Sequence, residues 1–457
     1  MYGLADDVKP GVADIKEFAL VDNAAALFEK SSGNKLHRDP LTGKCKVLPL
    51  GKWKTSLTQE DVGYPYLQIS KQLSMVGVEL TASWQTTRKI NNDDLQNRVQ
   101  SCIGSWKSGK QLPLVARPFS VNTYCLSKVW FRTSSIDLRE GDIANITSKA
   151  KSYVYQDLLQ KPSEVTLFRK VQDGGLGLHH VRCKSLAHLI STFILTAANK
   201  RYQQSLYSSW LYRYHVETDT RLPDPGFPPY YTPDFFMIIR TVKEDTVLNP
   251  IYLSVNQWYQ YLLETQVTTR VIDDEGRREQ IPNRVEELSP TTQWGEVYRL
   301  SRLHGLSPSS KSFLFKLIHQ LLPSRERVSR LMPANSPLCW CDSGDVESYL
   351  HLFFTCDKNR EAAAAMMHCA KVYDEDLTPD KILSLQVKAD EIYMMATIAM
   401  ITTGLETIWA NRQLKKITTG YMMRADLECA VSIRRRSRNR VIRESGDIMQ
   451  NTLTNFF

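Results

Sequence analysis

The sequence Leu4-Ala5-Asp6-Asp7 places two adjacent carboxylates behind a small residue near the first residue of the chain. At a tight turn between two strands, such a pair can reach two divalent metal ions that lie about 3.5–4 Å apart. The site needs a third carboxylate from an earlier strand, and only three residues precede Leu4. This interpretation predicts the rear part of a larger protein, with an incomplete metal site. The alternative is a solvated turn or a helix start, since Asp93-Asp94 forms a second such pair.

The residues that follow predict a helix and two short strands. Four apolar residues between positions 18 and 28 repeat at spacings of three and four, and Gly33 stands where this helix would end. Segments 46–51 and 75–80 have the composition of short strands, each near a glycine. Strand, helix, strand, strand is the order expected for part of a small α+β domain. The apolar stripe of the helix consists of Phe18, Val21, Ala25 and Phe28.

From Ser83 onward the hydrophobic pattern predicts mostly helices. The turn 174–178 contains three glycines but lacks the following Lys and Ser or Thr of a phosphate-binding loop. Segment 222–233 holds five prolines and predicts a linker or a long surface loop. Two helical stripes are Ile143, Ile146, Ala150 and Tyr153, and Leu314, Leu317, Ile318 and Leu321, the second ending at 322–324. Aromatic side chains expected in the core are Trp84, Trp106, Trp130, Phe131, Trp258 and Trp294.

Cys339, Cys341, His351 and Cys356 form the sharpest local group of metal-ligand candidates. Thiolates with one imidazole, close together in the chain, suit tetrahedral zinc. Only one residue separates the first two cysteines, whereas the usual spacing is two. The alternative is therefore three buried thiols and an exposed histidine, and possible substitute ligands are His368 and Cys369.

The net charge of +9 favours a polyanionic partner. The excess is concentrated between Arg412 and Arg443, where the alternative is a solvated helix face. The apolar stretch 392–410 contains Glu406 and predicts a buried helix rather than a membrane span, so we expect no membrane partner. Nine scattered cysteines and no recognisable signal peptide predict an intracellular protein, nuclear or cytoplasmic.

In this order, the motifs resemble the C-terminal half of a reverse transcriptase from non-LTR (LINE-like) retrotransposons. The resemblance runs from Leu4 to about Cys356. Leu4 to Asp7 resembles the catalytic box, although an aromatic residue usually stands where Leu4 is. His37 to Gly43 departs from the family spacing as an insertion. The other matching segments are Ser31 to Gly33, Lys35-Leu36 and Lys44, then Met75 to Val78 (the primer-gripping hairpin), Leu126 to Phe131 and Gly174 to Leu178 (the thumb), and Phe313 to Leu331 with the cysteine–histidine group (the zinc-binding module).

The resemblance implies an α+β remnant of a polymerase palm, followed by a mostly helical thumb, a zinc module and a helical tail. The implied segments are 1–85, 86–221, 222–300, 301–360 and 361–457. Asp6 and Asp7 would help to hold two Mg²⁺ ions, and Lys44 and Gly77 would lie near the nucleotide and the primer. Phosphates of an RNA template and a DNA primer would meet Lys128, Lys149, Lys151, Arg434, Arg435, Arg436, Arg438 and Arg440.

Three functions remain open on the sequence alone. The first is a fragment of an RNA-directed DNA polymerase, inactive as an isolated chain because one metal carboxylate is missing. The second is a non-enzymatic zinc module that binds RNA or DNA. The third is a zinc-stabilised scaffold, favoured if the arginines pair with the protein's own acids. Pro379-Asp380-Lys381 is a faint echo of a nuclease motif, and we expect it to be a helix start instead.

Overall fold

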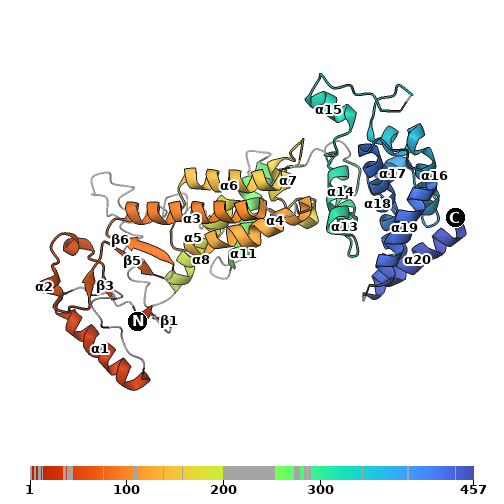
Figure 1. Ribbon diagram of the computed structural model, residues 1–457. Coiled ribbons are helices and arrows are strands. Elements are labelled where there is room, and N and C mark those ends of the chain that lie inside the picture. Colours follow the sequence, from red (N-terminus) through yellow and green to blue (C-terminus); the bar gives the residue numbers. More distant parts are fainter. Residues whose placement is uncertain are drawn as a thin grey trace. The chain divides into compact units, whose positions relative to one another are not determined.

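The computed structural model divides into two compact units, whose bounds are Met1–Arg98, Lys128–Ile143 and Ser185–Asn256 for the first and Val99–Ser127, Ala144–Lys184 and Gln257–Phe457 for the second. Most described residues are helical, with short strands, which agrees with an α+β class in the coarse sense (Figure 1). The structure describes residues 3–4, 7–8, 12, 14–33, 38, 45–75, 77–107, 112–136, 138–156, 158–198, 253–271, 278–282, 286, 290–341, 343–388, 391–437 and 439–456. The predicted linker 222–233 lies outside them.

The described strands form four separate two-stranded sheets rather than one common sheet. Three pairs are antiparallel and the pair β3–β4 is parallel. Leu4 and Asp7 are register partners in the first pair. The pairs are β1 (Gly3–Leu4) with β2 (Asp7–Val8), β3 (Lys46–Val47) with β4 (Gln68–Ile69), β5 (Gln72–Met75) with β6 (Val78–Thr81), and β7 (Thr269–Val271) with β8 (Arg278–Gln280).

The prediction of one strand over 75–80 is wrong, because the chain reverses within it. Met75 and Val78 are register partners on the two arms of a hairpin. Gly77 lies between them with a φ of 75°, a left-handed conformation that most residues avoid. The predicted strand over 46–51 is also shorter than expected, since only Lys46–Val47 pair.

The predicted first helix is confirmed as α1 (Glu17–Ser32), and Gly33 ends it with a φ of 74°. Its apolar stripe is only partly buried: Phe18 is buried, whereas Phe28 is exposed. The remaining helical elements that involve the first unit are η1 (Gly51–Lys54), α2 (Gln59–Val62), α3 (Trp84–Lys107), α5 (Ser127–Thr133) and α8 (Val181–Ala198).

The second unit is built from helices whose starts are set by hydroxyl caps. Ser307, Thr378 and Thr419 each accept a hydrogen bond from a backbone N–H in the first turn of the helix that follows. Its elements are η2 (Leu114–Ala116), α4 (Arg117–Ser120), η3 (Val121–Leu126), α6 (Glu140–Val154), α7 (Glu164–Phe168), η4 (Val171–Asp173), α11 (Val255–Leu263), η6 (Glu264–Thr268), α13 (Trp294–Leu300), α14 (Pro308–Ile318), α15 (Arg325–Leu331), η7 (His351–Thr355), η8 (Asp357–Asn359), α16 (Arg360–Lys371), α17 (Pro379–Leu383), α18 (Glu391–Gln413), α19 (Gly420–Arg435) and α20 (Arg440–Phe456).

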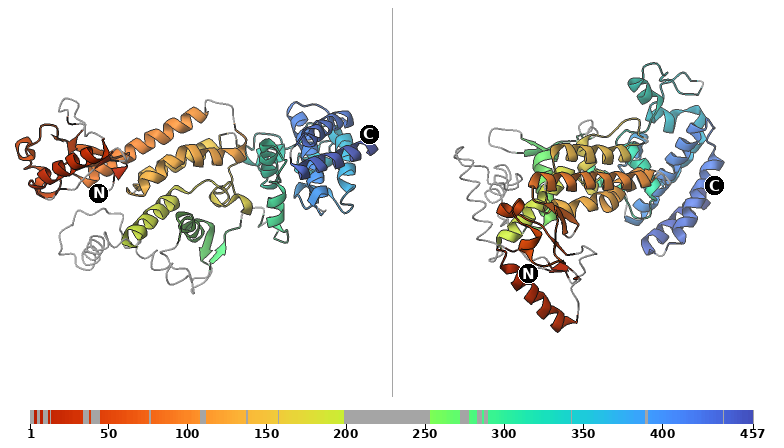
Figure 2. Two further views of the ribbon diagram at one scale, coloured as in Figure 1. Left: turned by 90° about the horizontal axis from the view of Figure 1, so that it is seen from below. Right: turned by 60° about the vertical axis from the view of Figure 1, so that its left-hand side comes forward.

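Helices α16, α18, α19 and α20 pack into one bundle around α18 (Figures 1 and 2). Ile398, Ile401 and Leu405 of α18 are fully buried there. By length and composition α18 could cross a bilayer, but 72% of its most apolar window is buried inside the protein. The prediction of a buried core helix over 392–410 is therefore confirmed.

Other sequence predictions are only partly met. Trp258 is buried, but Phe131 is 56% exposed, so its assignment to the core is wrong. The amphipathic helix at 314–321 ends at Ile318, three residues before the predicted stop at 322–324 begins its last residue pair, although Leu321 is still buried. Residues 174–178 form the predicted turn, and a Cβ on Gly174 would lie 2.3 Å from the Tyr298 ring. Asp380 lies in the first turn of α17, as expected for a helix start.

Candidate metal centre

The four predicted zinc ligands come together in a buried cluster. One ligand atom from each of Cys339, Cys341, His351 and Cys356 lies within 4.8 Å of the others. The Sγ atoms of Cys339 and Cys356 are 3.8 Å apart, and Cys341 Sγ is 3.3 Å from His351 Nε2. Tetrahedral zinc with Zn–S bonds of about 2.3 Å has S–S edges of about 3.8 Å. The donor set and its spacing therefore fit one zinc ion, and the alternative of an exposed histidine is wrong.

A tight turn explains how two cysteines separated by one residue serve the same site. Leu338 and Val346 form an antiparallel bridge, and the Cys339 N–H donates to the Asp345 carbonyl at 2.8 Å. In an extended segment, residues i and i+2 point to one face. Cys339 and Cys341 consequently both face the cluster.

A π-helical turn brings His351 and Cys356 to the same side. At 3.6 residues per turn, residue i+5 of an α-helix lies far around the helix from residue i. The wider turn η7 is closed by a hydrogen bond from the Cys356 N–H to the His351 carbonyl at 2.8 Å. Such π-turns are rare and occur frequently at functional sites.

The electrostatics of the thiols differ across the cluster. Burial raises the pKa of Cys356 to about 12 and also raises that of Cys339. Burial acts in the same direction on Cys341, but hydrogen bonds from Ser343, Cys339 and His351 together outweigh it and lower the Cys341 pKa to about 6. A coordinating thiol is deprotonated outright by a bound metal, so zinc would supply the charge compensation that the buried thiolates lack.

The second nitrogen of His351 is directed at polar groups outside the cluster. Nδ1 lies 3.6 Å from Asp345 Oδ2 and 3.4 Å from Thr355 Oγ1. A carboxylate or hydroxyl at this position fixes the tautomer and the orientation of a metal-binding imidazole.

We expect Asp345→Asn to weaken zinc binding about tenfold or more, because it removes the charged partner of the imidazole. Competition with a chelator of known zinc affinity measures the change. Asp357→Asn is the control, because Asp357 is exposed and pairs with Arg360 instead. Equal zinc affinity in wild type and Asp345→Asn would contradict the role of the carboxylate.

A buried ion pair joins the turn between Cys341 and His351 to helix α18. Glu347 is fully buried, and its carboxylate accepts from Arg412 Nη2 at 2.5 Å and from the Arg325 N–H at 2.8 Å. The Arg412 guanidinium also lies 4.9 Å from the centre of the Trp409 ring. Sequence reasoning did not single out Glu347 and counted Arg412 among the residues available to a polyanion.

The residues predicted near a polymerase centre are described only in part. Asp7 is placed by its backbone in β2, whereas Asp6 and Lys44 lie outside the described residues. Gly77 forms the turn of the β5–β6 hairpin. The magnesium site therefore stays a prediction.

The three thumb lysines differ in their surroundings. Lys128 is exposed. Lys149 Nζ donates to Gln100 Oε1 at 2.6 Å, and Lys151 pairs with Glu164 and lies over the Phe168 ring.

The arginines of the C-terminal run are mostly engaged within the protein. Arg434 is only 6% exposed and donates to the Gly305 carbonyl at 3.0 Å, so its guanidinium is directed into the protein rather than toward a partner. Arg435 pairs with Asp447 at 2.8 Å, and Arg440 pairs with Glu444 at 2.6 Å. Arg436 is exposed, and Arg438 lies outside the described residues.

Comparison with known proteins does not assign this geometry to a family. No family model matches the chain, and no curated protein matches it. The buried cysteine–histidine cluster and the order of motifs in the sequence are the observations that bear on function.

Proposed function

We propose that this chain is a nucleic-acid-binding segment of an RNA-directed DNA polymerase of the non-LTR retrotransposon type, stabilised by one zinc ion. The observation that carries the proposal is the buried cluster of Cys339, Cys341, His351 and Cys356, followed by basic helices. Zinc of this ligand class holds together short segments that have little core of their own. The order of the motifs along the sequence supports the assignment to a reverse transcriptase.

In this proposal Asp6 and Asp7 are magnesium ligands, and the partners are an RNA template and a DNA primer. The pairing of Leu4 with Asp7 supports this part, because it puts the stretch in a strand-turn-strand setting. The hairpin that turns at Gly77 supports the resemblance to a primer-gripping element. Magnesium would supply charge neutralisation at the reacting phosphates.

We expect affinity for a fluorescein-labelled single-stranded RNA to fall steeply with salt, because phosphate contacts release counterions. Replacing Arg435, Arg436 and Arg440 by Gln should reduce the slope of log affinity against log salt by about 2, at about 0.7 per lost contact on a single strand. Arg434 is left unchanged because it is buried. Fluorescence anisotropy over a salt series measures the slope.

The control for this experiment removes the same charge elsewhere. Lys46, Lys54 and Lys71 are exposed in the first unit, and their replacement by Gln should leave the slope near that of wild type. Affinity that does not change with salt, or the absence of RNA binding at low salt, would contradict the proposed function.

A second candidate function is a zinc-stabilised scaffold without a nucleic-acid partner. The observation that favours it is the pairing of Arg412, Arg435 and Arg440 with the protein's own carboxylates. Exposed pairs of this kind contribute little to stability and still compete with phosphates for the arginine. The salt series separates the two functions, because a scaffold retains no RNA.

A further inference from the structure

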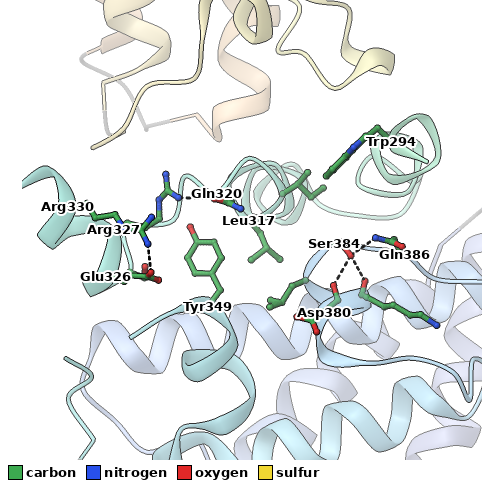
Figure 3. A pocket seen from close by; sticks show the side chains of 14 residues that line it. Trp294, Leu317, Gln320, Glu326, Arg327, Arg330, Tyr349, Asp380, Ser384 and Gln386 are labelled. Atoms are coloured by element: carbon green, nitrogen blue, oxygen red, sulfur yellow. Dashed lines mark hydrogen bonds and ion pairs between the residues drawn. The ribbon is translucent and has the colours of Figure 1, made fainter. Parts of the chain in front are cut away.

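A groove in the second unit combines basic, aromatic and amide side chains (Figure 3). Its volume of about 640 Å³ lies within the range of small-molecule and cofactor sites. Residues of α13, α14, α15 and α17 line it, together with Tyr349. The groups that matter for recognition are Arg327, Arg330, Lys381, Trp294, Tyr349 and Gln320.

One end of the groove is suited to a phosphate group. Arg327 and Arg330 lie one helical turn apart on α15, and both line the groove. A planar guanidinium matches the oxygen pair of a phosphate. Two acids also line the groove: Glu326, which is paired with Arg330 at 2.5 Å, and Asp380, which starts α17.

The remainder of the groove is suited to a planar base. Leu317 is buried at its floor, and the Tyr349 hydroxyl donates to the Leu322 carbonyl at 2.8 Å, so the ring is fixed in place. Trp294 is half-buried on the wall opposite Arg330 (Figure 3). A basic groove with aromatic rings is the usual site for a single strand, because every base has a stacking face.

Gln320 has a backbone conformation that favours glycine. It follows α14 with a φ of 52°, and the next N–H, from Leu321, returns to the Lys316 carbonyl. Glycine is the usual residue at this position. Leu385, with a φ of 51° after α17, is fully buried, and packing accounts for its side chain. The Gln320 amide instead lines the groove and accepts from Arg327 Nη1 at 3.1 Å.

We propose that this groove binds a segment of single-stranded nucleic acid, with a phosphate at Arg327 and Arg330 and a base against Trp294. The inference rests on the proposed function and assigns part of that binding to one site. Gln320 positions Arg327, and its own amide adds a hydrogen-bonding group at the base of the groove.

The test compares two arginines in matched settings. Arg330 is 63% exposed and pairs with Glu326 four residues before it, and Arg424 is 43% exposed and pairs with Glu428 four residues after it. With a short fluorescein-labelled oligodeoxythymidylate, Arg330→Gln should weaken binding about fivefold or more and reduce the salt slope by about 0.7. Arg424→Gln should bind as wild type does. Wild-type affinity in Arg330→Gln, or an equal loss in Arg424→Gln, overturns the groove.

Gln320→Gly separates a role in binding from a role in folding. Glycine relieves the left-handed conformation, so the melting temperature should stay the same or rise. The affinity for the oligonucleotide should fall, because the amide that holds Arg327 is lost. A lower melting temperature with wild-type affinity would show that Gln320 serves only the fold. If wild type itself fails to bind at low salt, the proposed function fails; if it binds but the groove variants are normal, only the groove is wrong.

Discussion

Cys356→Ser should abolish zinc binding and unfold segment 337–356, whereas Cys369→Ala should leave the zinc content unchanged. Both cysteines are fully buried, but only Cys356 has its sulfur within ligand distance of Cys339, Cys341 and His351. Structural zinc contributes on the order of 10 kcal/mol to the folding of small zinc domains. Segment 337–350 contains one isolated bridge and no helix that reaches a full turn before Tyr349, so little else holds it.

Metal analysis of purified protein measures this prediction directly. We expect about one zinc per chain in wild type and in Cys369→Ala, and close to none in Cys356→Ser. A zinc chelator added to wild type should expose segment 337–356 to a protease, and added zinc should restore protection. Protein prepared under reducing conditions that contains no zinc, or zinc retained in Cys356→Ser, would contradict the assignment.

The zinc ligands could be predicted from the sequence because their residue types are rare and lie close together. The geometry that joins them could not. The spacing of Cys339 and Cys341 argued against chelation, and only the turn closed at Asp345 shows that both sulfurs reach one point. The π-turn from His351 has no sequence signature, yet it determines which side of the helix Cys356 faces.

The burial of Arg434 had a signal in the sequence that was masked by its neighbours. Met423, Leu427, Val431 and Arg434 are the buried residues of α19, at spacings of four, four and three. This is the stripe of an amphipathic helix. The run of arginines that follows drew attention to charge, although helical periodicity places Arg434 on the buried face and Arg435 on the exposed one.

The hairpin at Gly77 was missed because its two arms have the same composition. Met75, Val78 and Leu80 all favour strands, and a single glycine can mark a bulge as well as a turn. The pairing of Glu347 with Arg412 was beyond local reasoning, since 65 positions separate the two residues. Both cases depend on tertiary contacts that no window of sequence contains.

Glu347→Gln should destabilise the second unit by about 3 kcal/mol or more, because it leaves the Arg412 charge buried without its partner. Arg412 is 16% exposed and Glu347 is fully buried, so water cannot replace the lost carboxylate charge. The control is Glu428→Gln, which breaks the exposed pair with Arg424 and should cost about 1 kcal/mol or less. Urea unfolding of the two variants and wild type measures the difference.

The same substitution should also weaken zinc binding, since Glu347 lies in the turn between Cys341 and His351 and fixes it to α18 through Arg412. Replacing Arg412 by Met in the Glu347→Gln background should recover part of the lost stability, because the uncompensated charge is then absent. Recovery should be incomplete because Arg412 also donates to the Pro323 carbonyl. If Glu347→Gln costs no more than Glu428→Gln, the buried pair does not couple the metal centre to the helical bundle.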